Sequence, residues 1–172
     1  MQHTYQKVVN YLVNSPAPPD DSIYDYANKM RESFGFETNN SSRKVYFLEE
    51  YPFVLKVDNE ALGSKWLQNK NELALYRQVQ NEAPQFLRLL PKIYWVSSCT
   101  RFMLVEKIPY EVMEEDINSL LRTTFVSEFI SWLNDNTNQD LYEVKKESSW
   151  RKVTSTSGYK LVDAGCLLGR FN

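Results

Sequence analysis

The stretch Pro52–Val57 reads Pro-Phe-Val-Leu-Lys-Val and places one lysine, Lys56, inside an otherwise apolar run. A short run of this kind between turn residues is typical of a β-strand. A lysine in an apolar strand costs free energy unless its charge is needed. Further along the chain, Glu72 lies among apolar residues on a predicted helix, and Leu161–Gly165 places Asp163 at the end of another apolar strand. Most predictions for this chain depend on the order of these three residues, Lys56, Glu72 and Asp163.

The composition is that of a folded chain without an obvious nucleic-acid or membrane partner. The 172 residues suffice for one core or for two small lobes. A 42 % apolar and 14 % aromatic content excludes wholesale disorder. The 20 basic and 22 acidic side chains give a net charge of −2, and there is no long basic run, so we expect no nucleic-acid partner. No apolar stretch approaches membrane-spanning length and no signal-peptide pattern opens the chain, so we expect no membrane partner.

Cysteine and histidine usage adds two further expectations. Cys99 and Cys166 are the only cysteines, and they show neither metal-ligand spacing nor a disulfide framework. This usage favours a reducing, cytoplasmic compartment. The one histidine, His3, lies near the N-terminus. A mechanism with a central catalytic histidine is therefore not expected.

Hydrophobic periodicity predicts an α+β chain in three parts. Residues 1–34 are predicted to be an N-terminal helical extension, with two amphipathic helices on either side of a proline-rich break. Residues 35–108 are predicted to form a lobe with an antiparallel sheet. Residues 109–172 are predicted to form a smaller, mostly helical lobe.

The individual elements follow from the same patterns. Thr38–Ser42 is predicted to be the polar loop of a first hairpin, and no strand is predicted from Pro109 to residue 158. The predicted strands are 43–47, 53–57, 92–96, 101–106 and 159–162, and the predicted helices outside the extension are 61–81, 111–121 and 124–135.

The order of hairpin, lysine strand, glutamate helix, second hairpin, linker and helices resembles the protein-kinase fold from about Gly35 to Gly165. The resemblance implies an antiparallel-sheet N-terminal lobe, a truncated, mostly helical C-terminal lobe, and a site for ATP and Mg²⁺. The detail of Ser41–Tyr46, V-L-K, N-E-L-A-L-Y and L-V-D-A-G is most similar to small kinase-like proteins of phages. That similarity implies a viral protein in the host cytoplasm.

The resemblance assigns roles to five residues of the first lobe. The strand with Lys56 is similar to the V-A-I-K strand of kinases, so Lys56 would hold the α- and β-phosphates of ATP. Glu72 would pair with Lys56. Val54 lies on the same strand face as Lys56 by alternation, and it would contact the adenine. The backbones of Glu106 and Ile108 would bond the adenine edge.

The second lobe matches the family less well. Asp163 stands where kinases carry D-F-G and would bind Mg²⁺, but no His-Arg-Asp catalytic loop occurs. The best alignment of Leu141–Trp150 gives Glu143 as the base and Ser148 as the second metal ligand. Asp140 is another candidate base, and the alternative is that this segment is a charged surface loop. Glutamate reaches one methylene further than aspartate, and a misplacement of about 1 Å can cost on the order of 100-fold in rate.

Two further departures concern substrates. The loop that covers the phosphates in kinases is glycine-rich, whereas this chain has Gly35 and then no glycine through Ser42. Only Cys166–Asn172 follow Gly165, too few residues for the peptide-substrate groove of protein kinases.

Each key residue also has an ordinary structural interpretation. Lys56 can be an edge-strand residue whose ammonium reaches water. Glu72 can lie at the boundary of a helix's buried face, and the aspartate–x–glycine of Asp163 can be a simple turn. Their occurrence together, in this order, favours the kinase-like interpretation.

Three functions remain open from the sequence. The first is a degenerate kinase-like protein, a pseudokinase, that binds a host or other partner protein with or without residual ATP binding. The second is a minimal ATP-dependent phosphotransferase with Glu143 or Asp140 as the base. The third is a non-kinase α+β interaction domain in which Lys56 is structural.

Overall fold

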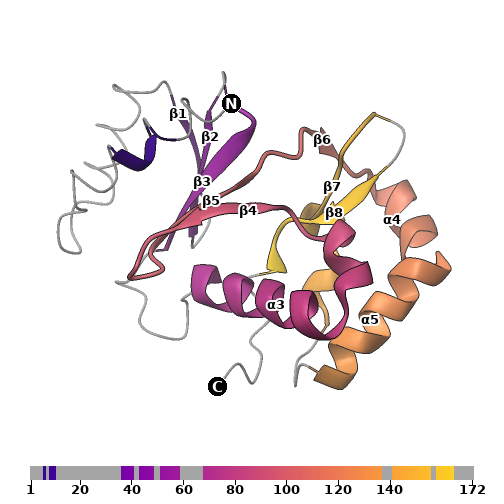
Figure 1. The fold of residues 1–172 in the computed structure, drawn as a ribbon. Helices are drawn as coiled ribbons and strands as arrows, with labels where there is room; N and C mark the ends of the chain where they lie inside the picture. Colours follow the sequence, from indigo (N-terminus) through magenta and orange to yellow (C-terminus); the bar gives the residue numbers. More distant parts are fainter. Residues whose placement is uncertain are drawn as a thin grey trace. The chain divides into compact units, whose positions relative to one another are not determined.

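A computed structural model of the chain describes residues 6, 8–10, 36–40, 43–48, 51–58, 68–136, 141–155 and 158–164, and of residues 36–40, 48 and 143 it describes the backbone only. The chain divides into two compact units. Unit 1 comprises residues 1–67 and 93–107, and unit 2 comprises residues 68–92 and 108–172. The predicted α+β class is confirmed by antiparallel sheets and several helices (Figure 1). The predicted parts 1–34, 35–108 and 109–172 stay predictions.

Unit 1 is built on a five-stranded antiparallel sheet in the order β1-β2-β3-β5-β4 (Figure 1). Strand β3 lies in the middle, because it pairs with β2 on one side and with β5 on the other. The strands are β1 (Phe36–Asn40), β2 (Arg43–Leu48), β3 (Phe53–Asp58), β4 (Ile93–Val96) and β5 (Phe102–Glu106).

These strands confirm the four predicted between residues 43 and 106, with one correction. Thr38–Asn40 was predicted to lie in a loop but belongs to β1, where Thr38 pairs with Tyr46. The polar run Thr38–Asn40 hides this strand, because an edge strand needs no apolar alternation when its backbone is paired on one side.

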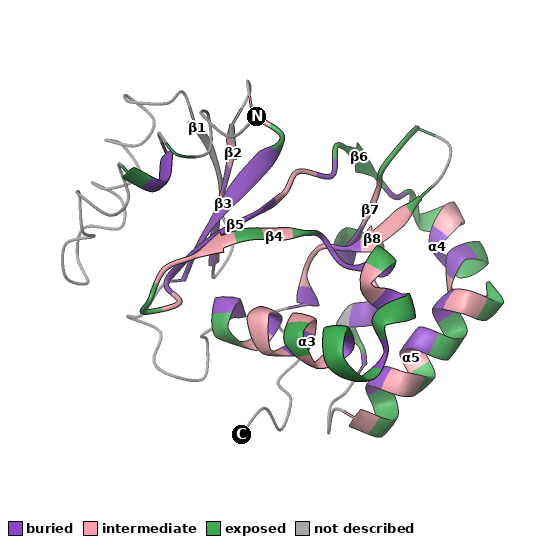
Figure 2. Ribbon diagram, viewed as in Figure 1, coloured by how far each residue is buried: buried purple, intermediate pink, exposed green. Residues whose placement is uncertain are grey.

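Strand β3 is buried along its whole length, and Figure 2 shows it in purple from end to end. Alternation divides its side chains between the two faces of the sheet. The Leu55 face consists of Tyr46, Phe53, Leu55, Val57, Phe102 and Leu104, with Tyr51 and Trp95 beside them. The Lys56 face carries Val54, Met103 and Val105, with Val45, Phe47, Ile93 and Val96 beside them.

The N-terminal part of the chain contributes to the Leu55 face. Val8 and Val9 are buried in the same cluster as Leu55, and residues 8–10 are helical. The rest of the predicted helices 2–13 and 21–34 lies outside the described residues. The N-terminal residues that the structure describes therefore belong to the core of unit 1.

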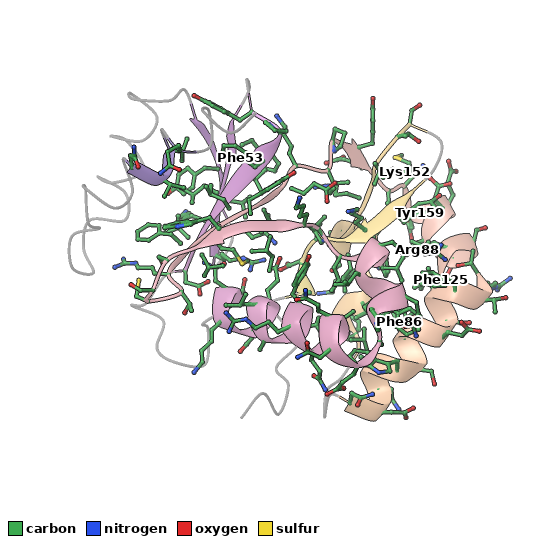
Figure 3. The ribbon with its side chains drawn as sticks, in the orientation of Figure 1. Phe53, Phe86, Arg88, Phe125, Lys152 and Tyr159 are labelled. Carbon is green, nitrogen blue, oxygen red and sulfur yellow. The ribbon has the colours of Figure 1, made fainter. Side chains whose placement is uncertain are left out.

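Unit 2 holds one large apolar core between its helices and a small sheet. The helices are α3 (Gln68–Glu82), η4 (Pro84–Leu89), α4 (Glu114–Leu121), α5 (Thr124–Asn136), η5 (Glu143–Lys145) and η6 (Glu147–Ser149). Phe86 of η4 lies 5.3 Å from Phe125 and from Phe129 of α5, measured between ring centroids. The guanidinium of Arg88 lies 3.4 Å from the centroid of Phe125, and Figure 3 shows Phe86, Arg88 and Phe125 near one another. The predicted helices 61–81, 111–121 and 124–135 are confirmed in the described residues, except that α4 begins at Glu114 and Glu111 belongs to a strand; 61–67 lies outside the described residues.

The absence of strands between Pro109 and residue 158 was predicted wrongly. β6 (Tyr110–Glu111), β7 (Trp150–Lys152) and β8 (Tyr159–Leu161) form a three-stranded antiparallel sheet in the order β6-β7-β8. Strands of two or three residues are too short to show a period of two. The turn before β8 uses Gly158 with φ 77°, a conformation that favours glycine.

Candidate functional site

Lys56 lies at the centre of the Lys56 face. It pairs in register with Val45 of β2 and with Met103 of β5, and it is 3 % exposed. The edge-strand interpretation is therefore wrong, because β3 is paired on both sides and the residue is buried. A buried ammonium is costly in an apolar setting without compensation. The sequence thus places a charge where a globular core alone would favour an apolar residue.

The residues predicted to bind the adenine lie on β3, at the end of β5 and just after it. Val54 is buried on the Lys56 face and pairs with Val105, as alternation predicts. Glu106 ends β5 opposite Phe53, and the following Lys107 donates its N–H to the carbonyl of Pro52 at 3.0 Å. Ile108 is buried and belongs to unit 2. The backbone bonds of Glu106 and Ile108 to an adenine stay predictions.

The Glu106 carboxylate affects the pKa of Tyr94 on β4. Burial raises the pKa of Tyr94, and the nearby negative charge of Glu106 raises it further. The ring of Tyr94 lies 6.3 Å from that of Phe53, which belongs to the Leu55 face. Because Glu106 pairs with Phe53, its side chain also belongs to the Leu55 side of the sheet. Any part that Glu106 plays on the Lys56 face is therefore limited to its backbone.

Glu72 lies on the buried stripe of α3. The buried residues of this helix follow helical spacing and are Gln68, Asn69, Glu72, Leu75 and Val79. Glu72 is 5 % exposed, so the interpretation as a boundary residue is wrong. Glu72 belongs to unit 2 and Lys56 to unit 1, and their ion pair stays a prediction.

The segment predicted to be either a catalytic loop or a charged surface loop is anchored to the core of unit 2 by its apolar residues. Leu141, Val144 and Trp150 are buried in that core. The indole Nε1–H of Trp150 donates to the carbonyl of Val144 at 2.8 Å. Lys145 and Glu147 are exposed, as the surface-loop interpretation expects, but the apolar residues of the segment anchor it to the core. Glu143 begins η5.

The two predicted metal ligands lie on segments that share a backbone hydrogen bond. Val162 donates its N–H to the carbonyl of Ser149 at 2.7 Å. Ser148 precedes one partner and Asp163 follows the other; Ser148 is exposed and Asp163 is half-buried. One hydroxyl and one carboxylate suit Mg²⁺, which keeps several waters and takes further ligands from phosphates. Asp140, the second candidate base, lies outside the described residues.

Two features are absent from the described residues, a cluster of metal-binding side chains and a membrane-spanning helix. Within the described ranges, no group of three or more histidine, cysteine, aspartate or glutamate side chains is arranged to hold a metal ion. No helix in that same part of the chain has the length and apolar character needed to cross a membrane.

Sequence reasoning missed further charged residues beside Lys56. Arg43, Asp58 and Arg101 are all buried in unit 1. The signal was the alternation of Arg43 with Val45 and Phe47, which places the arginine on the same strand face as two apolar residues.

Comparisons with known proteins returned no relatives. No family model matches the chain, no curated protein matches its sequence, and no solved structure matches its fold.

Proposed function

We propose that the chain is a degenerate kinase-like protein, a pseudokinase, that binds an adenine nucleotide on the Lys56 face and acts by binding a partner protein. The observation that carries the proposal is the burial of Lys56 on the middle strand of the sheet, on the face that also carries Val54 and Met103. If the phage resemblance holds, the partner is a host protein.

The Lys56 face offers the two surfaces that a nucleotide requires. Adenine needs an apolar surface, and phosphates need a fixed cation. Val54 and Lys56 are two residues apart on one strand face, which is a rise of roughly 6.6 Å at 3.3 Å per residue. An adenine against Val54 and a phosphate at Lys56 fit this spacing.

The order of elements supports the kinase-like interpretation. The β1–β2 hairpin precedes the lysine strand β3, and α3 with Glu72 separates β3 from the β4–β5 hairpin. Asp163 follows β8, the last strand. The roles of Glu72 and Asp163 remain implied by the resemblance.

The missing catalytic motif supports loss of phosphoryl transfer. The chain has no His-Arg-Asp, and its single histidine is His3. Binding without turnover is then the function that Lys56 supports best, because kinases use the lysine of this strand to hold the phosphates of ATP.

A minimal phosphotransferase is the second candidate, favoured by one observation. The Ser149–Val162 backbone bond joins the segments that carry Ser148 and Asp163. A carboxylate base, Glu143 or Asp140, would accept the proton of the substrate hydroxyl.

A thermal melt with and without ATP and Mg²⁺ tests the proposal. Ligand at about 100 times its Kd adds roughly 2.7 kcal/mol of stability. We expect this stabilisation in the wild type, its loss in Lys56→Met, and retention in Lys70→Met, which changes an exposed lysine of α3. Loss of the Mg²⁺ dependence in Asp163→Asn would support the metal role.

Other outcomes separate the alternatives. No stabilisation of the wild type at millimolar ATP contradicts nucleotide binding and favours the non-kinase interaction domain. Transfer of labelled phosphate from ATP that disappears in Lys56→Met contradicts the pseudokinase and favours the phosphotransferase. If Lys56→Met does not fold, the wild-type measurements alone decide between these results.

A further inference from the structure

A row of charged residues crosses three strands beside Lys56. Arg43 of β2 pairs in register with Asp58 of β3. Asp58 donates its N–H to the carbonyl of Arg101 at 3.0 Å, which continues the β3–β5 register by one pair beyond Val57 and Phe102. Arg43, Asp58 and Arg101 therefore lie side by side across the sheet.

This row lies on the Lys56 face. Val45 and Met103, the register partners of Lys56, belong to that face, and residues two positions apart on a strand share a face. Arg43 is two residues from Val45, and Asp58 is two residues from Lys56. Register and alternation thus place three cations of this face, Arg43, Lys56 and Arg101, around Asp58. These three basic residues, without Asp58, are called the cation row below.

The cation row is buried and positively charged. Arg43, Lys56 and Arg101 are 3 %, 3 % and 7 % exposed, and Asp58 is fully buried. Three cations against one carboxylate give these four groups a net charge of +2. Charges interact more strongly in a low-dielectric setting than in water, so an anion of two or more charges gains most at such a row. An uncharged ligand gains nothing from it.

We propose that the cation row binds the phosphate chain of the nucleotide, with Arg43 and Arg101 replacing the amide cradle of a glycine-rich loop. The proposal deepens the proposed function and rests on it for the adenine. Guanidinium groups bind phosphate oxygens through two parallel hydrogen bonds. Residues opposite one another on antiparallel strands lie about 5 Å apart, and residues i and i+2 about 7 Å apart. Consecutive phosphates of a di- or triphosphate can contact neighbouring cations at these spacings.

The competing explanation is a structural ion cluster. Arg43 and Arg101 would then serve only to balance the Asp58 carboxylate inside the sheet. The Cζ of Arg101 also lies 5.9 Å from the Phe102 ring, a long distance for a cation–π contact, so the ring does not account for the burial of the arginine. A structural cluster stabilises the apoprotein but does not distinguish ATP from adenosine.

Titration calorimetry on the full chain separates the two explanations. The ligands are ATP, ADP, adenosine and inorganic tripolyphosphate, and the variants are Arg43→Met, Arg43→Lys and Lys44→Met. Lys44 is the matched control, because it is also buried and basic but alternates onto the Leu55 face with Tyr46. Met keeps the approximate length of the side chain and removes its charge.

We expect the wild type to bind ATP more tightly than ADP, and ADP more tightly than adenosine. Arg43→Met should weaken ATP binding roughly ten- to hundredfold, the range for a lost charged hydrogen bond, and change adenosine binding less than about twofold. Arg43→Lys should recover part of the loss, and Lys44→Met should leave the ratio of ATP to adenosine affinity unchanged. Arg101→Met serves as a second variant if Arg43→Met does not fold.

The outcomes also distinguish this inference from the proposed function. Equal binding of ATP and adenosine, or an affinity ratio unchanged in both arginine variants, overturns the cation row as a phosphate site and leaves nucleotide binding standing. Binding of tripolyphosphate without adenosine supports the row and contradicts the adenine site. Failure of all four ligands to bind overturns both.

Discussion

The two units hold their sheets in different ways. In unit 1, β3 is paired on both sides and buried from Phe53 to Asp58, with apolar clusters on both faces. In unit 2, the short strands of the β6-β7-β8 sheet have one buried face, anchored by Trp150 and Leu161. The first sheet is held by apolar contacts that repeat along both of its faces, whereas the second adds a few particular polar contacts to its one apolar face.

Those polar contacts of unit 2 join residues far apart in the sequence. Lys152 bonds Asp116 at 2.5 Å, and Lys160 donates to the carbonyl of Leu90 at 3.2 Å. Arg151 lies 3.2 Å from Glu111. Substitutions in the core of unit 1 should therefore cause a large loss of folding stability. Substitutions at the polar contacts of unit 2 should cause a smaller loss, limited to the contact that is removed.

The largest effect is expected from a cavity in the centre of the first sheet. Leu55 is fully buried, so Leu55→Ala should lower the free energy of unfolding by roughly 2–5 kcal/mol. Urea denaturation followed by circular dichroism measures this change. Met113→Ala, at a residue that is 58 % exposed, is the control and should stay within about 0.5 kcal/mol of the wild type. A cost below about 1 kcal/mol for Leu55→Ala would contradict the two-sided packing of β3.

The next effect tests whether the N-terminal residues belong to this core. Val8 is fully buried against the Leu55 face, so Val8→Ala should cost roughly 2 kcal/mol from the two methyl groups removed and the cavity left. Gln6→Ala, at an exposed position in the same segment, should change stability little. Equal melting temperatures for Val8→Ala and the wild type would mean that this segment is not part of the folded core.

A smaller and more specific effect is expected in unit 2. Trp150→Phe keeps most of the buried ring but removes the donor to the Val144 carbonyl. An unsatisfied buried carbonyl should cost roughly 1–3 kcal/mol, and the change adds the cost of the smaller ring. Trp132→Phe, at a half-buried tryptophan of α5, is the matched control. A loss no greater than that of the control in urea denaturation would show that the indole bond does not hold the 141–150 segment.

Most strands of unit 1 can be predicted from the sequence, because they are longer than those of unit 2. β2, β3 and β5 each have five or six residues, long enough for apolar alternation or a continuous apolar run to be visible. That pattern places Val54 and Lys56 on one face, and the helical spacing of Leu75 and Val79 places Glu72 inward. The local sequence therefore predicts which residues lie on the candidate nucleotide-binding face.

The remainder is decided by contacts between distant residues. β7 reads Trp-Arg-Lys, which has no period, and it becomes a strand because β6 and β8 pair with it. The charged run 143–147 suggests a surface loop, and its local sequence does not show that Val144 and Trp150 anchor the segment to the core. The Arg43–Asp58 pair depends on the β2–β3 register, which local periodicity does not supply.

The smallest effect concerns the ion pair between α4 and β7. The hydrogen bond from Lys152 lowers the pKa of Asp116 below its ordinary value of 3.8, and the same bond raises the pKa of Lys152 above 10.5. Because the folded pKa of Asp116 is lowered, its contribution to stability is present above pH 3.8 and is lost as the pH falls below that value. The Lys152 contribution is present below pH 10.5 and is lost as the pH rises above it. Asp116→Asn should therefore melt slightly below the wild type at pH 7, and the difference should shrink in acid and in high salt, since salt screens a partly exposed ion pair. A difference that is the same at pH 7 and pH 3 would show that the Asp116 charge does not stabilise the folded state.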